Sequence, residues 1–93
     1  MKEKEIYAYV AEHCPYCALC GIAWRLHIHH IKYRSEGGAT DFYNLIRLCE
    51  NCHAMVHSSK RVWQSRLHKI LKTIVIYECH YSPEIVKYVL EHD

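Results

Sequence analysis

The sequence predicts an α+β fold in which two short strands and a helix form a ββα core and more helices follow toward the C terminus. Residues 26–30 alternate apolar and polar side chains, which is typical of a half-buried strand. His53 and His57 are four residues apart, so their rings would share one face of a helix. Residues 82–90 combine a helix start signal with an apolar stripe.

All 93 residues are expected to form one small domain, with a core at about residues 14–58 and a helical extension at about residues 60–93. A hydrophobic core alone barely holds a fold of this length, so a structural metal would help. The sequence has no apolar run of about 18 residues for a membrane span, and residues 1–5 lack the apolar stretch of a secretory signal. We expect a cytoplasmic location, where the six cysteines would be metal ligands or free thiols rather than disulfides.

The first half of the chain contains the predicted strands. Residues 6–10 fit a strand by alternation and a helix by the spacing of their apolar ends, so both assignments stay open. Residues 25–30 and 45–48 are predicted as strands one and two, and residues 32–41 form a loop that a Gly-Gly pair opens. The helix that carries His53 and His57 is predicted to begin near Glu50.

The second half of the chain is mainly helical. Residues 60–72 are predicted as a helix whose apolar face is formed by Val62, Leu67, Ile70 and Leu71. Residues 73–77 are β-branched and aromatic, so a short strand and a buried helix end both stay open. Ser82 caps the last helix and Pro83 takes its first position, while its stripe is formed by Ile85, Val86, Val89 and Leu90. Core or rim positions are expected for most tyrosines, Trp24 and Trp63.

Spaced cysteines predict a structural zinc site. The cysteines at positions 14, 17 and 20 make two overlapping Cys-x-x-Cys pairs, and only one pair can join the pair at 49 and 52 in a tetrahedral site. The expected ligands are Cys17, Cys20, Cys49 and Cys52. We favour this set because Gly21, directly after the first pair, permits the tight turn of a zinc knuckle, and Cys14 is the reserve ligand. Four thiolates leave no open coordination position, so this zinc would be structural.

The histidines predict a second metal site of a different kind. His53 and His57 can share one ion, and a third ligand can come from His29 or His30 if a strand crosses their helix. Neighbouring residues on a strand point to opposite faces, so His29 and His30 cannot easily bind the same ion. A metalloprotease site of the His-Glu-x-x-His type is excluded because Ala54 stands where that motif has glutamate.

Positive charge gathers in the middle of the chain. Residues 25–72 carry nine Lys and Arg against three acidic residues, although the formal net charge of the whole chain is only +2. Residues 51–77 contain no acidic residue, which suits a surface that lies on phosphates. The predicted contacts to nucleic acid are Lys32, Arg34, Lys60, Arg61, Arg66 and Lys69.

Several coupled motifs in one order resemble the HNH endonucleases, the ββα-metal or His-Me finger nucleases that include colicin nuclease domains. The resemblance covers roughly residues 17–58. It rests on His29-His30-Ile31, Gly37-Gly38, Asn44-Leu45 and the Cys-x-x-Cys-His-x-x-x-His run at 49–57. It implies a ββα-metal nuclease core with a structural zinc on four cysteines and extra C-terminal helices. A Cys-x-x-Cys-Gly at this distance before the His-His pair is also typical of the family, which supports the favoured cysteine pair.

The resemblance assigns roles to the site residues. It implies that His29, His53 and His57 hold one catalytic divalent ion, either Mg²⁺, Mn²⁺, Ni²⁺ or Zn²⁺. His30 would be the general base, and Asn44 would hold the loop so that the base points correctly. The reaction implied is hydrolysis of DNA phosphodiester bonds, by nicking or double-strand cleavage, which leaves 5′-phosphate and 3′-hydroxyl ends.

The sequence therefore leaves two candidate functions. The first is a metal-dependent DNA endonuclease, and the alternative is a non-catalytic, zinc-stabilised DNA-binding module, which would have no use for the histidines and Asn44 together. Small proteins of the family include homing, restriction-associated and phage-encoded enzymes, some of which serve DNA packaging beside a terminase. DNA and a terminase or other DNA-processing protein are thus the expected partners, for a monomer or weak dimer.

Overall fold

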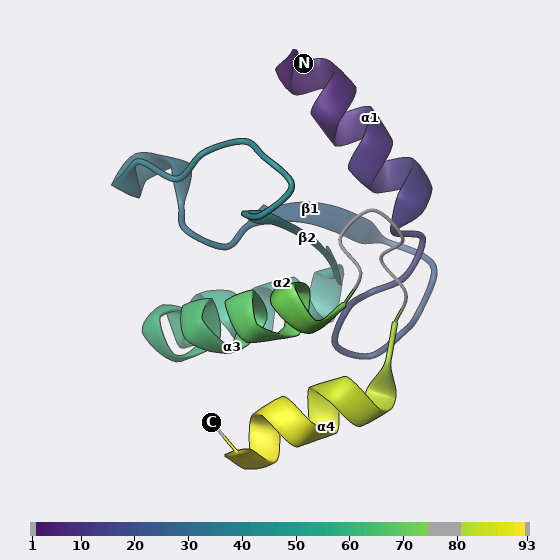
Figure 1. The fold of residues 1–93 in the computed structure, drawn as a ribbon, viewed down its shortest axis with the longest axis vertical. Coiled ribbons are helices and arrows are strands. Elements are labelled where there is room, and N and C mark those ends of the chain that lie inside the picture. Colours follow the sequence, from purple (N-terminus) through teal and green to yellow (C-terminus); the bar gives the residue numbers. More distant parts are fainter. Residues whose placement is uncertain (1, 75–80, 93) are drawn as a thin grey trace.

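The computed structural model describes residues 2–74 and 81–92 (Figure 1). The elements are α1 (Glu3–His13), β1 (Leu26–His30), the 3-10 turn η1 (Arg34–Glu36), β2 (Leu45–Cys49), α2 (Glu50–Ser58), α3 (Lys60–Thr73) and α4 (Pro83–His92). The predicted α+β class and the ββα order of β1, β2 and α2 are confirmed. No helix of the described part is long and apolar enough to cross a lipid bilayer.

The two strands form an antiparallel hairpin between two helices. Leu26 lies opposite Cys49 and His30 lies opposite Leu45. Helix α1 packs on one face of the hairpin and α2 on the other (Figure 1). Because side chains alternate along a strand, successive residues of β1 face different helices.

Helix α1 resolves the assignment that stayed open for residues 6–10. Ile6 and Val10 are 9% and 5% exposed, and residues at i and i+4 share a helix face. Burial of this pair against the hairpin stabilises a helix, whereas a strand here would need a further pairing partner.

The observed strand bounds differ from the predicted ones by one residue at each strand. Arg25 was predicted to start strand one, but its φ of 54° is left-handed and incompatible with a strand. Its carbonyl oxygen instead accepts from the Glu50 backbone N–H at 3.0 Å. Strand β2 continues to Cys49, one residue beyond the prediction. In the loop between the strands, a Cβ at Gly38 would collide with the carbonyl oxygen of Lys32, so only glycine fits there.

Helix α3 buries three of the four residues predicted for its apolar face, Leu67, Ile70 and Leu71. Val62 was predicted in the apolar face but is 49% exposed, while Trp63 is 9% exposed. The buried side chains of α3 are Trp63, Leu67, Ile70 and Leu71. Their spacing of three and four residues defines the stripe, and Val62 lies about 100° to one side of Trp63 around the axis.

Helix α4 and the segment before it also refine the predictions. Val86 and Val89 are buried, but Leu90 is 40% exposed and lies outside the buried stripe. The hydroxyl of Ser82 accepts from the Ile85 backbone N–H at 3.4 Å, as expected of a cap. Of the segment 73–77, Thr73 ends α3, and residues 75–77 lie outside the described part of the chain. Trp24 is 64% exposed and belongs to the surface rather than the core.

Candidate metal centres and active site

A cluster of four cysteines joins the segment before β1 to the junction of β2 and α2. The thiol sulfurs of Cys17, Cys20, Cys49 and Cys52 lie within 4.8 Å of one another. The Cys20 and Cys49 sulfurs are 3.6 Å apart. Tetrahedral zinc with Zn–S bonds of about 2.3 Å separates its sulfur ligands by roughly 3.8 Å. The cluster is therefore consistent with a zinc site, while Cys14, the reserve ligand, lies in the core at 6% exposure.

The turn after Cys17 has the backbone of a knuckle. Gly21 has a φ of 80°, and its N–H donates to the Cys17 carbonyl at 2.9 Å. The Cys17 N–H in turn donates to the Ile22 carbonyl at 2.8 Å. A left-handed φ at this position favours glycine, which agrees with the argument for this pair over the reserve.

The Cys17 and Cys52 thiols of this cluster differ in how easily they ionise. Burial raises the pKa of the Cys17 thiol, but backbone hydrogen bonds from Cys49, Cys20 and Leu19 outweigh it and lower that pKa to about 7. Burial and the adjacent Cys49 and Cys17 sulfurs raise the pKa of Cys52 far above its usual range. The Cys17 thiolate therefore forms easily, whereas ionisation of Cys52 is suppressed. A bound divalent cation removes this conflict, because it stabilises all four thiolates.

Three histidines form a second cluster where β1 crosses α2. Ring nitrogens of His29, His53 and His57 lie within 4.8 Å of one another. The Nε2 atoms of His53 and His57 are 3.0 Å apart. Strand β1 supplies the first histidine and successive turns of α2 the other two. His27, which points to the same side of the strand, stacks on His53 with ring centroids 5.3 Å apart.

His29 is the buried member of this cluster. It is 3% exposed, and its Nε2 has no hydrogen-bond partner within residues 2–74 and 81–92. Burial, and then the charges of His53 and His57, lower the pKa of His29 to about 4. It is therefore neutral at pH 7 with a nitrogen lone pair available. A buried polar nitrogen without a partner is costly, and the cluster fits one divalent ion.

His30 lies on the other face of the strand, as the alternation predicts. Its Nε2 is 3.0 Å from the Thr40 hydroxyl and 3.5 Å from the Tyr7 hydroxyl of α1. Burial, and then the Arg34 charge, lower the pKa of His30, so the ring is neutral at pH 7. The sequence alone did not indicate these contacts, because they depend on how α1 and the loop pack.

Asn44 holds the loop between the strands through its side-chain amide. Its Oδ1 accepts from the Lys32 backbone N–H at 2.8 Å. Its Nδ2 donates to the carbonyls of Lys32 at 3.0 Å and Ala39 at 2.8 Å. The amide thus joins the start of the loop to its end, next to Thr40, which contacts His30.

The histidines open onto one surface hollow of about 300 Å³. Its lining residues are Ile28, His29, His30, Tyr33, Arg34, Ser35, His53 and His57. Tyr33 was missed by the sequence argument, although its hydroxyl is 2.7 Å from His57 Nδ1. Its place three residues after the His-His pair, at the start of the loop, is the signal that could have found it.

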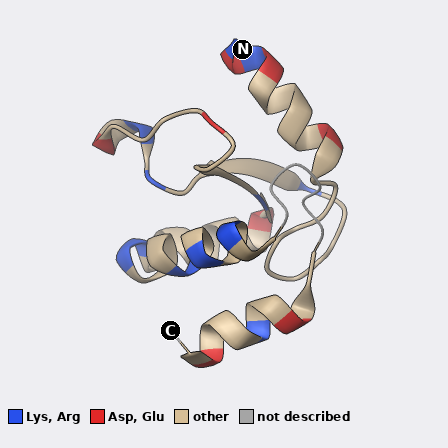
Figure 2. Ribbon diagram, viewed as in Figure 1, with Lys and Arg blue, Asp and Glu red and all other residues tan. Residues whose placement is uncertain are grey.

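The six predicted nucleic-acid contacts are spread over several environments. Figure 2 shows Lys and Arg along α3 and acidic residues on α1 and α4. Arg34 pairs with Glu3 at 3.2 Å, and Lys60 pairs with Glu36 at 3.1 Å. Lys32 and Arg61 are exposed, and the Arg66 guanidinium lies 5.1 Å from the centroid of the Trp63 ring. Arg34 is the one of these six that lines the histidine hollow.

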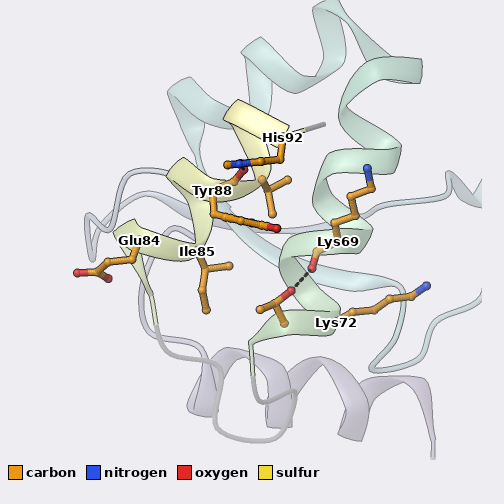
Figure 3. Close-up of a pocket in the computed structure, with 8 residues that line it drawn as sticks. Lys69, Lys72, Glu84, Ile85, Tyr88 and His92 are labelled. Atoms are coloured by element: carbon orange, nitrogen blue, oxygen red, sulfur yellow. Dashed lines mark hydrogen bonds between the residues drawn. The ribbon is translucent and has the colours of Figure 1, made fainter.

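Lys69 lines a second hollow, of about 550 Å³, between α3 and α4. Figure 3 shows Lys69 and Lys72 opposite Ile85 and Tyr88 of α4. This hollow shares no lining residue with the histidine hollow. Contact between Lys69 and nucleic acid at the histidine cluster stays a prediction.

A hairpin followed by a helix, with four cysteines at its base and three histidines across it, defines the ββα-metal class of domain. Comparison with known proteins agrees, because a sequence model described as HNH endonuclease matches residues 14–59. These residues of the chain therefore belong to the HNH endonuclease family. Proteins of this family typically act on nucleic acids.

The chain is also similar to anaredoxin from Nostoc sp. (strain PCC 7120 / SAG 25.82 / UTEX 2576). The two are 33% identical over 45 residues, which cover 44% of this chain. The match spans 59% of the length of anaredoxin, less than two thirds of that relative. No solved structure is significantly similar to the chain.

Proposed function

We propose that this protein is a metal-dependent endonuclease that hydrolyses DNA phosphodiester bonds. One observation carries the proposal: the buried Nε2 of His29, which has no hydrogen-bond partner in the part of the chain that the structure describes, lies in a cluster with His53 and His57, and the neutral His30 lines the same hollow. A module that only binds DNA would gain nothing from a buried nitrogen left without a partner, which costs stability.

His30 would act as the general base. If its Nε2–H donates to the Thr40 hydroxyl oxygen, Nδ1 keeps a free lone pair that can take a proton from water. The resulting hydroxide would attack phosphorus in line with the 3′ oxygen. Asn44 would hold the loop by donating to the Ala39 carbonyl, and so keep the neighbouring Thr40 in contact with His30.

The two metal centres would have separate tasks. A divalent ion held by His29, His53 and His57 would act as a Lewis acid on the phosphate, leaving 5′-phosphate and 3′-hydroxyl ends. Zinc on the four cysteines would be structural, because the thiolates fill its coordination sphere. Arg34, 62% exposed at the hollow, would contact a DNA phosphate, since an exposed pair such as Arg34–Glu3 is weak enough to exchange partners.

The test is cleavage of supercoiled plasmid across Mg²⁺, Mn²⁺, Ni²⁺ and Zn²⁺, with nicked and linear products separated. His30→Ala should lower the rate by about 10²–10⁴-fold while calorimetry still detects ion binding. His53→Ala should weaken ion binding and cleavage together. His92→Ala, a change at an exposed histidine of α4, is the matched control and should cleave like the parent.

Two outcomes would contradict the proposal. If His30→Ala cleaves at the parent rate, His30 is not the general base. A parent protein that binds duplex DNA but cleaves it with none of the four ions would favour the zinc-stabilised DNA-binding module instead.

A further inference from the structure

Tyr33 contacts two of the three clustered histidines. Its hydroxyl oxygen is 2.7 Å from His57 Nδ1. Its ring meets the His29 ring edge-on, with centroids 5.8 Å apart and planes at 90°. Tyr33 therefore bridges the buried histidine of β1 and the exposed histidine of α2.

The Tyr33 ring is held in place from helix α3. The Lys60 ammonium lies 4.5 Å from the ring centroid, a distance that permits a cation–π interaction. Lys60 pairs with Glu36 at 3.1 Å, and the Gln64 amide donates to the same carboxylate at 3.1 Å. Each exposed contact is weak alone, but together they fix where the Tyr33 hydroxyl points.

His57 needs such a partner more than the other two histidines do. His29 is buried in the core and His53 is half-buried under His27, whereas His57 is exposed. A free neutral imidazole exchanges its proton between Nδ1 and Nε2, and only the form with the proton on Nδ1 has an Nε2 lone pair for an ion. The Nε2 of His57 is the atom that faces His53.

We propose that Tyr33 is a positioning residue of the histidine metal centre, whose hydroxyl oxygen accepts the Nδ1–H of His57 and so fixes Nε2 toward the ion. The proposal rests on the proposed function, in which the three histidines hold a divalent ion. It adds a residue outside the ligand set and links the ion to α3 through Lys60.

The test compares Tyr33→Phe with the parent, because phenylalanine keeps the ring and removes only the hydroxyl. The probe is Co²⁺, titrated calorimetrically into protein that keeps its cysteine-bound zinc and has been cleared of metal at the histidines. Tyr33→Phe should bind Co²⁺ about 10- to 100-fold more weakly. Tyr43→Phe removes a hydroxyl from a tyrosine that is 63% exposed and should bind Co²⁺ like the parent.

A second measurement separates positioning from general damage. Nitrogen-15 NMR of the metal-free histidine site should show His57 with its proton on Nδ1 in the parent and a mixture of tautomers in Tyr33→Phe. Parent-like Co²⁺ affinity with an unchanged tautomer in Tyr33→Phe would overturn the inference. His57→Ala separates the proposed metal centre from the proposed role of Tyr33. If His57→Ala lowers Co²⁺ affinity, the histidines bind the ion, whatever the result for Tyr33→Phe. If it binds Co²⁺ like the parent, the histidines are not the metal centre and both proposals fail.

Discussion

Replacing Asn44 with alanine should destabilise the protein and slow cleavage. Asn44 is 7% exposed and makes three hydrogen bonds to loop backbone, at 2.8, 3.0 and 2.8 Å. A net contribution of about 1 kcal/mol for each bond gives a loss of about 3 kcal/mol. For a domain of this size that loss lowers the melting temperature by roughly 12–24 °C.

Two further variants sharpen this prediction. Asn44→Asp keeps the acceptor for the Lys32 N–H but turns a carboxylate oxygen toward the carbonyls of Lys32 and Ala39, so it should be at least as destabilising. Asn51→Ala changes an exposed asparagine of α2 and should alter stability by about 0.5 kcal/mol or less. Zinc content is measured on every sample, so that destabilisation from the lost loop hydrogen bonds is not confused with destabilisation from loss of zinc at the cysteines.

The assay is thermal unfolding of the zinc-loaded protein, followed by plasmid cleavage at a temperature where all variants are folded. Cleavage by Asn44→Ala should fall because the loop that carries Thr40 no longer holds His30. A melting temperature within about 4 °C of the parent, or a loss of less than about 1 kcal/mol, would refute the reasoning.

Three shorter predictions follow from other parts of the site. Cys49→Ser should unfold the protein or sharply lower its melting temperature, while Cys14→Ser should do far less, as zinc content and circular dichroism will show. Arg34→Ala should weaken binding to duplex DNA and reduce the slope of log affinity against log salt by about one, measured by fluorescence anisotropy with metal chelated. The pKa of His29 falls from 6.5 in the unfolded chain to about 4 in the fold, so the unfolded chain takes up a proton first as the pH is lowered. The free energy of unfolding of protein without metal at the histidines should therefore decrease as the pH drops. Urea unfolding should show a loss of about 1 kcal/mol between about pH 7 and pH 5.5, and a smaller loss in His29→Asn.

Local rules were enough to predict much of the site. Alternation along β1 separates His29 from His30, and the four-residue spacing on α2 brings His53 and His57 together. Both rules depend only on the geometry of one strand and one helix. The knuckle at Gly21 was predictable for the same reason, because a turn of a few residues sets its own backbone conformation.

Other features depend on packing between distant segments and could not be read from spacing. The contact of Tyr7 with His30 requires α1 to lie on the hairpin, and residues 6–10 fitted a strand as well as a helix. The choice of Trp63 over Val62 requires knowing which side of α3 meets the core. Arg34 was predicted as a phosphate contact from its charge and its place in the loop just after the histidine pair, and its partner Glu3 is 31 residues away in the sequence.

The cysteine cluster and the histidine cluster are joined through one turn of helix. Cys49 is the N-cap of α2, its sulfur accepts from the Cys52 N–H at 3.4 Å, and His53 is the next residue. The same cap that belongs to the cysteine cluster therefore fixes where α2 begins and how it rotates about its axis. A rotation of α2 by one residue, about 100°, would carry both His53 and His57 away from His29. A metal bound by the cysteines would therefore also hold α2 in the orientation in which the three histidines converge. The cysteine cluster would thus support the histidine cluster through the direction of a single helix.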